Sequence, residues 1–255
     1  MTVTVRPRPS LLACLSIPAP HEGSTMRHVL EAIEKKTAAF AELPLYAFMR
    51  DASIDPRQRL SFVPALAHFV MSFADLYGLV LREEPARDRY QEIVNAHTYE
   101  DGGHWKWFLA DLEKLGHDPR LPFSDALRFI WSDATTQIRM LSYRMCQLGL
   151  GADSLHKLVL VHCIEATGKV SLEHSAIIAR ELTLSSRKPL VYFGAHHVET
   201  EADHTLEDGG VHGMLADITL DPELSRELVT LVDSAFAAFT AFAGELLAFA
   251  KANLR

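Results

Sequence analysis

The sequence has few cysteines and no pattern that would join them in a disulfide framework or a zinc site. Its three cysteines, Cys14, Cys146 and Cys163, are far apart and form no CxxC motif. Sparse, unpatterned cysteine is typical of proteins from a reducing compartment. We therefore expect a cytoplasmic protein without disulfide bonds.

A basic surface for nucleic acid is also missing. The chain has 25 Lys and Arg against 33 Asp and Glu, a formal net charge of −8, and its basic residues form no stripe. Nucleic acid is therefore not an expected partner. The sequence contains no P-loop, no G-x-S-x-G and no H-E-x-x-H, so the enzyme classes that these motifs mark are not indicated either.

Two apolar runs, residues 63–81 and 236–250, resemble membrane spans only in composition. The first contains His68 and Asp75 and the second contains Glu245. Because such groups are costly inside a bilayer, both runs predict buried core helices, and no membrane partner is expected. Residues 1–23 contain only a short apolar run that ends at Pro18, which favours a flexible N-terminal arm over a signal peptide.

Apolar residues recur with helical spacing along nearly the whole chain, and no run alternates as a strand would. The length of 255 residues and the 48% apolar composition suit one large domain. We therefore predict a single all-α domain over residues 24–255 with seven helices. Their approximate ranges are 24–43, 55–83, 86–115, 124–148, 153–183, 189–206 and 222–251.

Several residues mark where these helices start or are disturbed. Asp55-Pro56 and Asp221-Pro222 each pair a capping residue with proline at the first helical position, which predicts a helix start. Pro64 is expected to kink the second helix. The adjacent glycines in "HTYEDGGH", residues 97–104, disfavour a regular helix interior and favour a close approach or a local opening there.

The same stretch shares a spacing of histidine and carboxylate with "HHVETEADH", residues 196–204. Each stretch has a histidine, a carboxylate four residues later and a second histidine three residues after that. These residues are His97, Asp101 and His104 in the first stretch, and His197, Glu201 and His204 in the second. Positions with this spacing share one helical face. The outer two lie about 10 Å apart along the axis, so two ions with the carboxylate between them fit better than one. The pattern predicts a dinuclear metal site between helices.

Glu165 is the candidate carboxylate from a third helix. It follows the apolar run Leu158–Ile164, where burying an unpaired carboxylate would be costly, and a metal ion would remove that cost. The alternative is an ion pair with Lys169, four residues later on the same face.

At these residues the chain resembles the heme-oxygenase-like diiron oxidases and oxygenases, which share a fold with heme oxygenase, TenA and the pyrroloquinoline quinone synthase. In that family a carboxylate and a histidine seven residues apart lie on one helix, and a glutamate lies on a later helix. An H-x-x-x-D-x-x-H motif follows about thirty residues beyond that glutamate. Here the interval from Glu165 to His197 is 32 residues, and the resemblance covers roughly residues 24–206.

Two positions depart from the family pattern. His97 stands where the family has a glutamate seven residues before the histidine, with Glu100 and Asp101 nearby, and Glu201 replaces the usual aspartate. The ligands that the resemblance then implies are His104, Glu165, His197, Glu201 and His204, with His97, Glu100 and Asp101 as competing candidates for the remaining place.

The resemblance implies a seven-helix, heme-oxygenase-like bundle that binds two non-heme iron ions. It further implies an oxidoreductase that uses O₂ to oxidise a small amino-acid-like or fatty-acid-like substrate. An external electron donor and a homodimer are both compatible with this expectation. Three alternatives stay open. They are a heme protein with His28 as ligand, a metal-free enzyme like TenA or the quinone synthase, and a non-enzymatic binding or regulatory protein that retains the fold.

Overall fold

The computed structural model describes residues 25–202 and 215–254, and these residues are helical, which confirms the all-α prediction. They contain one isolated antiparallel bridge, Thr25 to Thr219, and no strand. The N-terminal arm that we expected over residues 1–23 lies outside the described residues. The α-helices are α1 Met26–Ala41, α2 Pro44–Arg50, α3 Pro56–Arg59, α4 Ala67–Asp75, α5 Arg89–Asp101, α6 Trp105–Leu115, α7 Phe123–Ile130, α8 Thr136–Gly149, α9 Ser154–Ser186, α10 Ala195–Ala202 and α12 Pro222–Ala252, and the short 3₁₀ or π segments are η1 Val63–Leu66, η2 Leu76–Leu81 and η3 Asp133–Thr135.

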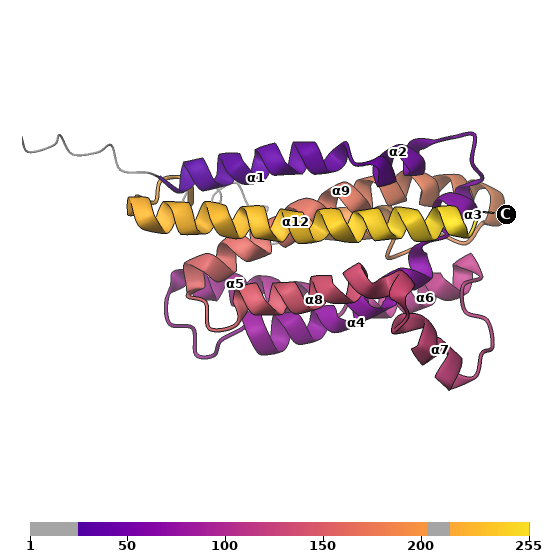
Figure 1. Ribbon diagram of the computed structural model, residues 1–255, viewed down its shortest axis with the longest axis horizontal. Helices are drawn as coiled ribbons and strands as arrows, with labels where there is room; N and C mark the ends of the chain where they lie inside the picture. The colour runs from indigo at the N-terminus through magenta and orange to yellow at the C-terminus, as the bar shows by residue number, and fades with distance from the viewer. Residues whose placement is uncertain (1–24, 203–214, 255) are drawn as a thin grey trace, which may run out of the picture.

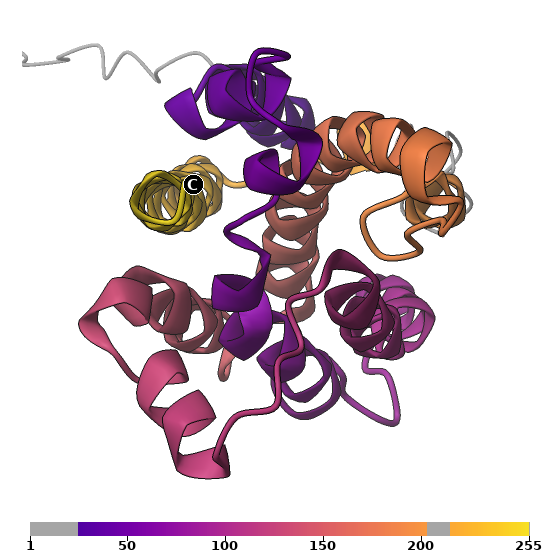
Figure 2. The same cartoon turned by 90° about the vertical axis from the view of Figure 1, so that its right-hand side faces the viewer.

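The long helix α9 forms the centre of the structure. It contacts α1, α2, α3, α5, α8, α10 and α12. Figure 2, viewed from one end, shows the other helices arranged around it, and Figure 1 shows α1 and α12 running along one side while α4, α5 and α8 lie along the other. Several faces of α9 are therefore covered by other helices.

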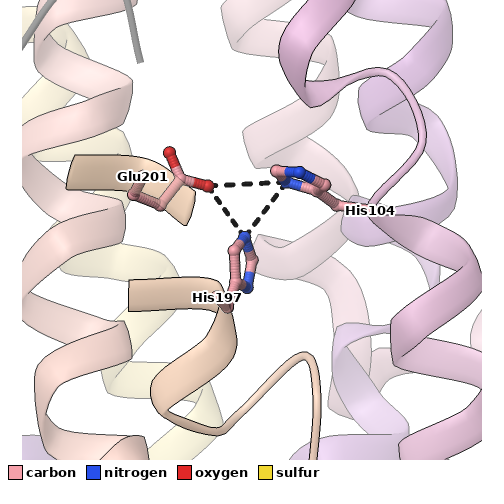
Figure 3. Close-up of side chains that lie close together, drawn as sticks. All are labelled: His104, His197 and Glu201. Carbon is pink, nitrogen blue, oxygen red and sulfur yellow. Dashed lines mark hydrogen bonds and ion pairs between the residues drawn. The ribbon is translucent and has the colours of Figure 1, made fainter. Parts of the chain in front are cut away.

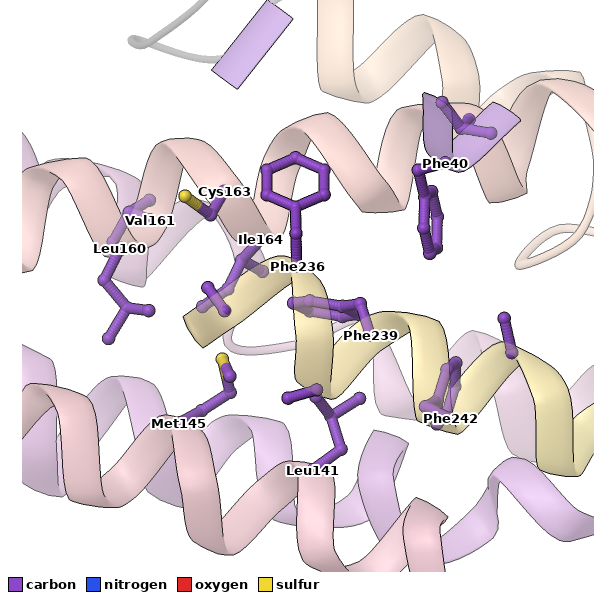
Figure 4. Close-up of a cluster of buried hydrophobic side chains, with 14 of the residues drawn as sticks. Phe40, Leu141, Met145, Leu160, Val161, Cys163, Ile164, Phe236, Phe239 and Phe242 are labelled. Atoms are coloured by element: carbon purple, nitrogen blue, oxygen red, sulfur yellow. The ribbon is translucent and has the colours of Figure 1, made fainter. Parts of the chain in front are cut away.

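The core is built from aromatic and aliphatic side chains of α1, α8, α9 and α12. Phe236 and Phe239 of α12 contact the ring of Phe40 edge to face, and Phe242 packs against Phe239 (Figure 4). Burying one such side chain stabilises the fold by about 1.5–3 kcal/mol. By length and composition alone, α12 and the stretch Pro56–Leu81 are each apolar enough to cross a membrane. In the most apolar 18 residues of each, half are buried in α12 and one third are buried in Pro56–Leu81.

The helix starts follow the predicted capping residues. The Asp55 side chain accepts a hydrogen bond from the backbone N–H of Arg57, and that of Asp221 from Glu223. The Asp153 carboxylate caps α9 in the same way, accepting from His156. These carboxylates satisfy amide groups that have no partner inside the helix, so these starts could be predicted from the sequence.

The prediction of seven uninterrupted helices is wrong, because four expected segments are divided or displaced. The segment 55–83 becomes α3, η1, α4 and η2, with the 3₁₀ turn at the expected kink around Pro64. The segment 124–148 becomes α7, η3 and α8. Pro44 occupies the first position of the short helix α2, where its missing N–H costs nothing.

The two remaining differences lie next to the histidine motifs. The segment 86–115 is divided into α5 and α6 by a turn over Gly102, Gly103 and His104. A Cβ at Gly102 would stand 3.2 Å from the carbonyl oxygen of Thr98, so a larger residue would disturb this turn. The helix expected from residue 189 begins only at Ala195, because residues 189–194 form a loop that approaches its own backbone closely at Gly194, where a Cβ would overlap the Leu190 carbonyl.

Candidate metal centre

Six histidine and carboxylate side chains gather in two groups of three. Within each group, one ligand atom per residue lies within 4.8 Å of the others. The first triad is His97, Asp101 and Glu165, and the second triad is His104, His197 and Glu201. The structure therefore brings together six of the eight predicted ligands, from α5, α9, α10 and the turn before α6.

The first triad is centred on the buried ring of His97. Its Nε2 lies 3.0 Å from Oε1 of Glu165 and 3.2 Å from Oδ2 of Asp101. His97 and Asp101 are one turn apart on α5, while Glu165 comes from the middle of α9, which packs against α5. One imidazole nitrogen and two carboxylates thus face a common point.

The second triad is equally compact (Figure 3). Nε2 of His197 lies 2.8 Å from Oε1 of Glu201 and 3.1 Å from Nδ1 of His104, and His104 Nδ1 lies 3.4 Å from the same carboxylate oxygen. His197 and Glu201 are one turn apart on α10, so the spacing of four residues places both on one face as predicted.

Asp101 connects the two triads. While its Oδ2 faces His97, its Oδ1 lies 3.6 Å from Nδ1 of His104. The turn at Gly102 and Gly103 makes this arrangement, because it ends α5 at Asp101 and redirects the chain before His104. In one straight helix the three side chains would lie in a line, whereas here His104 turns toward α10.

The donor atoms fit a metal ion in both chemistry and spacing. Imidazole and carboxylate together suit iron, manganese or zinc. Bonds of about 2.0–2.2 Å to one ion set neighbouring donor atoms roughly 3.0–3.4 Å apart. All six donor-to-donor separations in the two triads are within 4.8 Å, and five of them, at 2.8–3.4 Å, fall near this range. They are also hydrogen-bond lengths, so the same groups form a stable network in the metal-free chain.

The pKa values of two residues of the first triad, His97 and Glu165, are strongly shifted. Burial by itself lowers the pKa of His97, but the Glu165 and Asp101 carboxylates outweigh it and raise that pKa to about 11. Burial and the charge of Asp101 raise the pKa of Glu165 to about 7, against the opposing effect of His97. In the metal-free chain, His97 is therefore a cation at neutral pH, held between carboxylates.

Tyr77 is a neighbour of the first triad that sequence reasoning missed. Its fully buried hydroxyl donates to Oε1 of Glu165 at 3.2 Å and lies 3.3 Å from Nε2 of His97. Burial, with the nearby carboxylates, raises the pKa of Tyr77, so the phenol stays protonated and acts as a donor. Tyr77 lies on the π-helical segment η2, and π turns are frequent at functional sites.

The second triad is oriented by groups behind its histidines. Nδ1 of His197 donates to the Tyr192 carbonyl at 2.8 Å, which leaves Nε2 facing the triad. The Trp107 ring stacks on His104 at 4.3 Å between centroids and an interplanar angle of 18°. Trp107 thereby supports the ring of His104.

Asp111 fixes the loop that leads into α10. Its carboxylate is fully buried on α6 and accepts hydrogen bonds from the backbone N–H groups of Val191, at 2.9 Å, and Phe193, at 3.1 Å. Lys114, one turn later, lies 3.1 Å from the same carboxylate. Because His104 precedes α6 and His197 follows this loop, Asp111 couples the positions of the two histidines.

Three candidates from the sequence do not join the triads. Glu100 is one-third exposed, and its Oε2 lies 3.8 Å from Nδ1 of His97, on the side away from the first triad's shared point. His204 lies outside the described residues. His28, the residue weighed as a heme ligand, is exposed on α1.

A cavity of about 220 Å³ adjoins both triads. Asp101, Glu165, His104, His197 and Glu201 all contribute to its wall. The rest of the wall is mainly apolar and comes from α2, α4, α9, α12 and the segment before α10. A small molecule in this cavity would contact the candidate ligands directly.

No protein-family model matches this sequence, and a search of curated proteins finds no significantly similar chain.

Proposed function

We propose that this protein is a non-heme iron oxidase or oxygenase that binds two iron ions and uses O₂ to oxidise a small organic substrate. The observation that carries the proposal is the pair of triads joined by Asp101 at the end of a cavity. Six mixed nitrogen and oxygen donors from separate helices are the kind of set that holds dinuclear iron in helical proteins.

In this proposal His97, Asp101 and Glu165 hold one ion, and His104, His197 and Glu201 hold the other. Bound iron would supply the electrons that reduce O₂ and the oxidising power directed at the substrate. Asp101 would supply carboxylate oxygens to both positions, a role supported by its place beside both His97 and His104. In this assignment a carboxylate four residues after His97 would take the place that a glutamate at position 97 has in the family pattern.

The remaining residues orient the ligands and limit water. The Tyr77 hydroxyl holds Oε1 of Glu165, and the Tyr192 carbonyl fixes the ring of His197. The apolar wall of the cavity, with side chains such as Phe69 and Phe242, keeps bulk water from the reacting centre. These contacts fix the orientation of Glu165 and His197 before an ion binds, whereas His97 must first release its proton.

The finer description of the fold belongs to the same proposal. We assign the helices to a single-domain, heme-oxygenase-like bundle, since α9 as a central helix brings ligands from α5 and α10 together. A cytoplasmic location, a small-molecule substrate and an external electron donor complete the proposal, and a homodimer is compatible with it.

Iron stoichiometry tests the assignment. Full-length protein given ferrous iron without oxygen should bind about two ions per chain, followed by oxygen consumption when air is admitted. Glu201→Ala should lose one ion, because it removes the carboxylate of the second triad. Glu199→Ala is the matched control, since this exposed glutamate lies on the same helix outside the triad. Unchanged stoichiometry in Glu201→Ala would contradict the ligand assignment.

A metal-free enzyme is the second candidate, and the hydrogen-bonded first triad favours it. His97, Glu165 and Tyr77 already satisfy one another, with the pKa of Glu165 raised to about 7 by burial, as general acid–base catalysis requires. Protein that binds no iron under the conditions above would support this candidate or the non-enzymatic binding protein.

A further inference from the structure

The side chains that line the cavity beside the triads limit the class of ligand that it accepts. Aromatic side chains dominate one wall, where the rings of Phe69, Phe239 and Phe242 contact one another. Lys169 and Glu173 also belong to the wall and are exposed, so the cavity reaches the surface there. A ligand therefore enters beside these charged residues and places its body against rings.

The size of the cavity limits the size of the ligand. An apolar cavity of about 150 Å³ lined by aliphatic and aromatic side chains holds benzene. By proportion, the 220 Å³ available here holds roughly nine non-hydrogen atoms. The charged groups of this wall belong to the two triads and to Lys169 and Glu173, and the rest of the wall is mainly apolar.

Gly168 has no evident structural reason to be glycine. It lies in the middle of α9, where its φ is not positive and where glycine is unfavourable compared with alanine. Apart from its own helix backbone, no heavy atom of the described residues lies within 4 Å of where a Cβ would stand. Gly168 is one turn after Glu165 and lines the cavity. The absent side chain leaves space in the cavity itself.

We infer that the cavity binds a compact, hydrocarbon-rich molecule of roughly nine non-hydrogen atoms, and that Gly168 determines its specificity by leaving one side of the cavity open. Such a ligand suits the larger, apolar part of the wall better than a zwitterionic amino acid of the same size does. The identification of this ligand with the substrate rests on the proposed function, whereas the binding itself does not depend on iron chemistry.

Two probes of equal size separate these ligand classes. Indole and leucine each have about nine non-hydrogen atoms, but indole is uncharged and leucine is a zwitterion. Saturation-transfer NMR and calorimetric titration on the full-length protein should detect binding of indole. Leucine should bind at least tenfold more weakly, because most of the wall is apolar and burying two charged groups against it costs their hydration.

Two glycine variants locate the binding. Gly168→Leu should weaken indole binding at least tenfold, because the new side chain occupies the cavity. Gly244→Leu is the matched control, since Gly244 is also inside a long helix with open space around its Cβ position but does not line the cavity. Gly244→Leu should bind indole as the wild type does.

The results separate this inference from the proposed function. Leucine binding as tight as indole, absence of indole binding, or unchanged indole binding in Gly168→Leu would each overturn the inference. Iron content, measured on the same samples, judges the proposed function independently. Indole binding by iron-free protein would support the cavity assignment even where the oxidase proposal fails. Bound iron without indole binding would support the oxidase proposal and overturn the cavity assignment.

Discussion

Removing the Asp111 carboxylate should loosen the connection between α6 and α10 and separate the two histidines of the second triad. Asp111 is fully buried and holds the backbone of Val191 and Phe193 in the loop before α10. In Asp111→Ala these two backbone N–H groups lose their acceptor, and the loop is free to move away from α6.

The magnitude follows from the bonds that are lost. A hydrogen bond to a charged group contributes about 1.5–3 kcal/mol, so losing those from Val191 and Phe193 should lower the free energy of unfolding by about 3–6 kcal/mol. Asp111→Asn keeps one acceptor oxygen and should cost about half as much. Glu113→Ala removes an exposed carboxylate from the same helix and should change stability by less than about 0.5 kcal/mol.

Urea denaturation measures the stability, and anaerobic iron titration measures the site. We expect Asp111→Asn, the variant more certain to fold, to bind one ion normally and the ion at His104, His197 and Glu201 more weakly. A stability equal to that of the wild type would refute the hydrogen-bond reasoning. A loss of stability with wild-type affinity for both ions would show that Asp111 supports the fold and not the site.

Three further predictions concern residues around the triads. Asp101→Ala should reduce binding at both iron positions, because Asp101 faces both triads; loss of a single ion, measured by metal analysis, would contradict its bridging position. Because the pKa of His97 is raised to about 11, the ring is protonated below that pH and must release a proton to bind metal. Iron affinity should therefore rise by up to about tenfold per pH unit at neutral pH. Calorimetry in buffers of different ionisation enthalpy should detect at least one proton released on binding. An affinity independent of pH would exclude coordination by His97. Gly168→Ala should raise the free energy of unfolding by about 0.5–1 kcal/mol, since the alanine methyl group meets no neighbour, and a lowered melting temperature would show that the space at Gly168 is not open.

The sequence alone was enough to predict the all-helical class and several helix starts. Helical spacing of apolar residues and capping pairs such as Asp221-Pro222 act locally, so a single stretch contains the whole signal. The same applies to the candidate ligands within one helix, because His197 and Glu201 share a face as a consequence of their spacing.

What the sequence could not determine are distances between segments far apart in the chain. The partition of the six candidate ligands into two triads depends on where the turn at Gly102 directs His104 and on how α10 meets it. Tyr77 reaches Glu165 only because α4 continues into a π turn, and Asp111 meets Val191 across 80 residues. Such contacts depend on packing against α9, since the free energy that decides them comes from tertiary burial and not from local propensity.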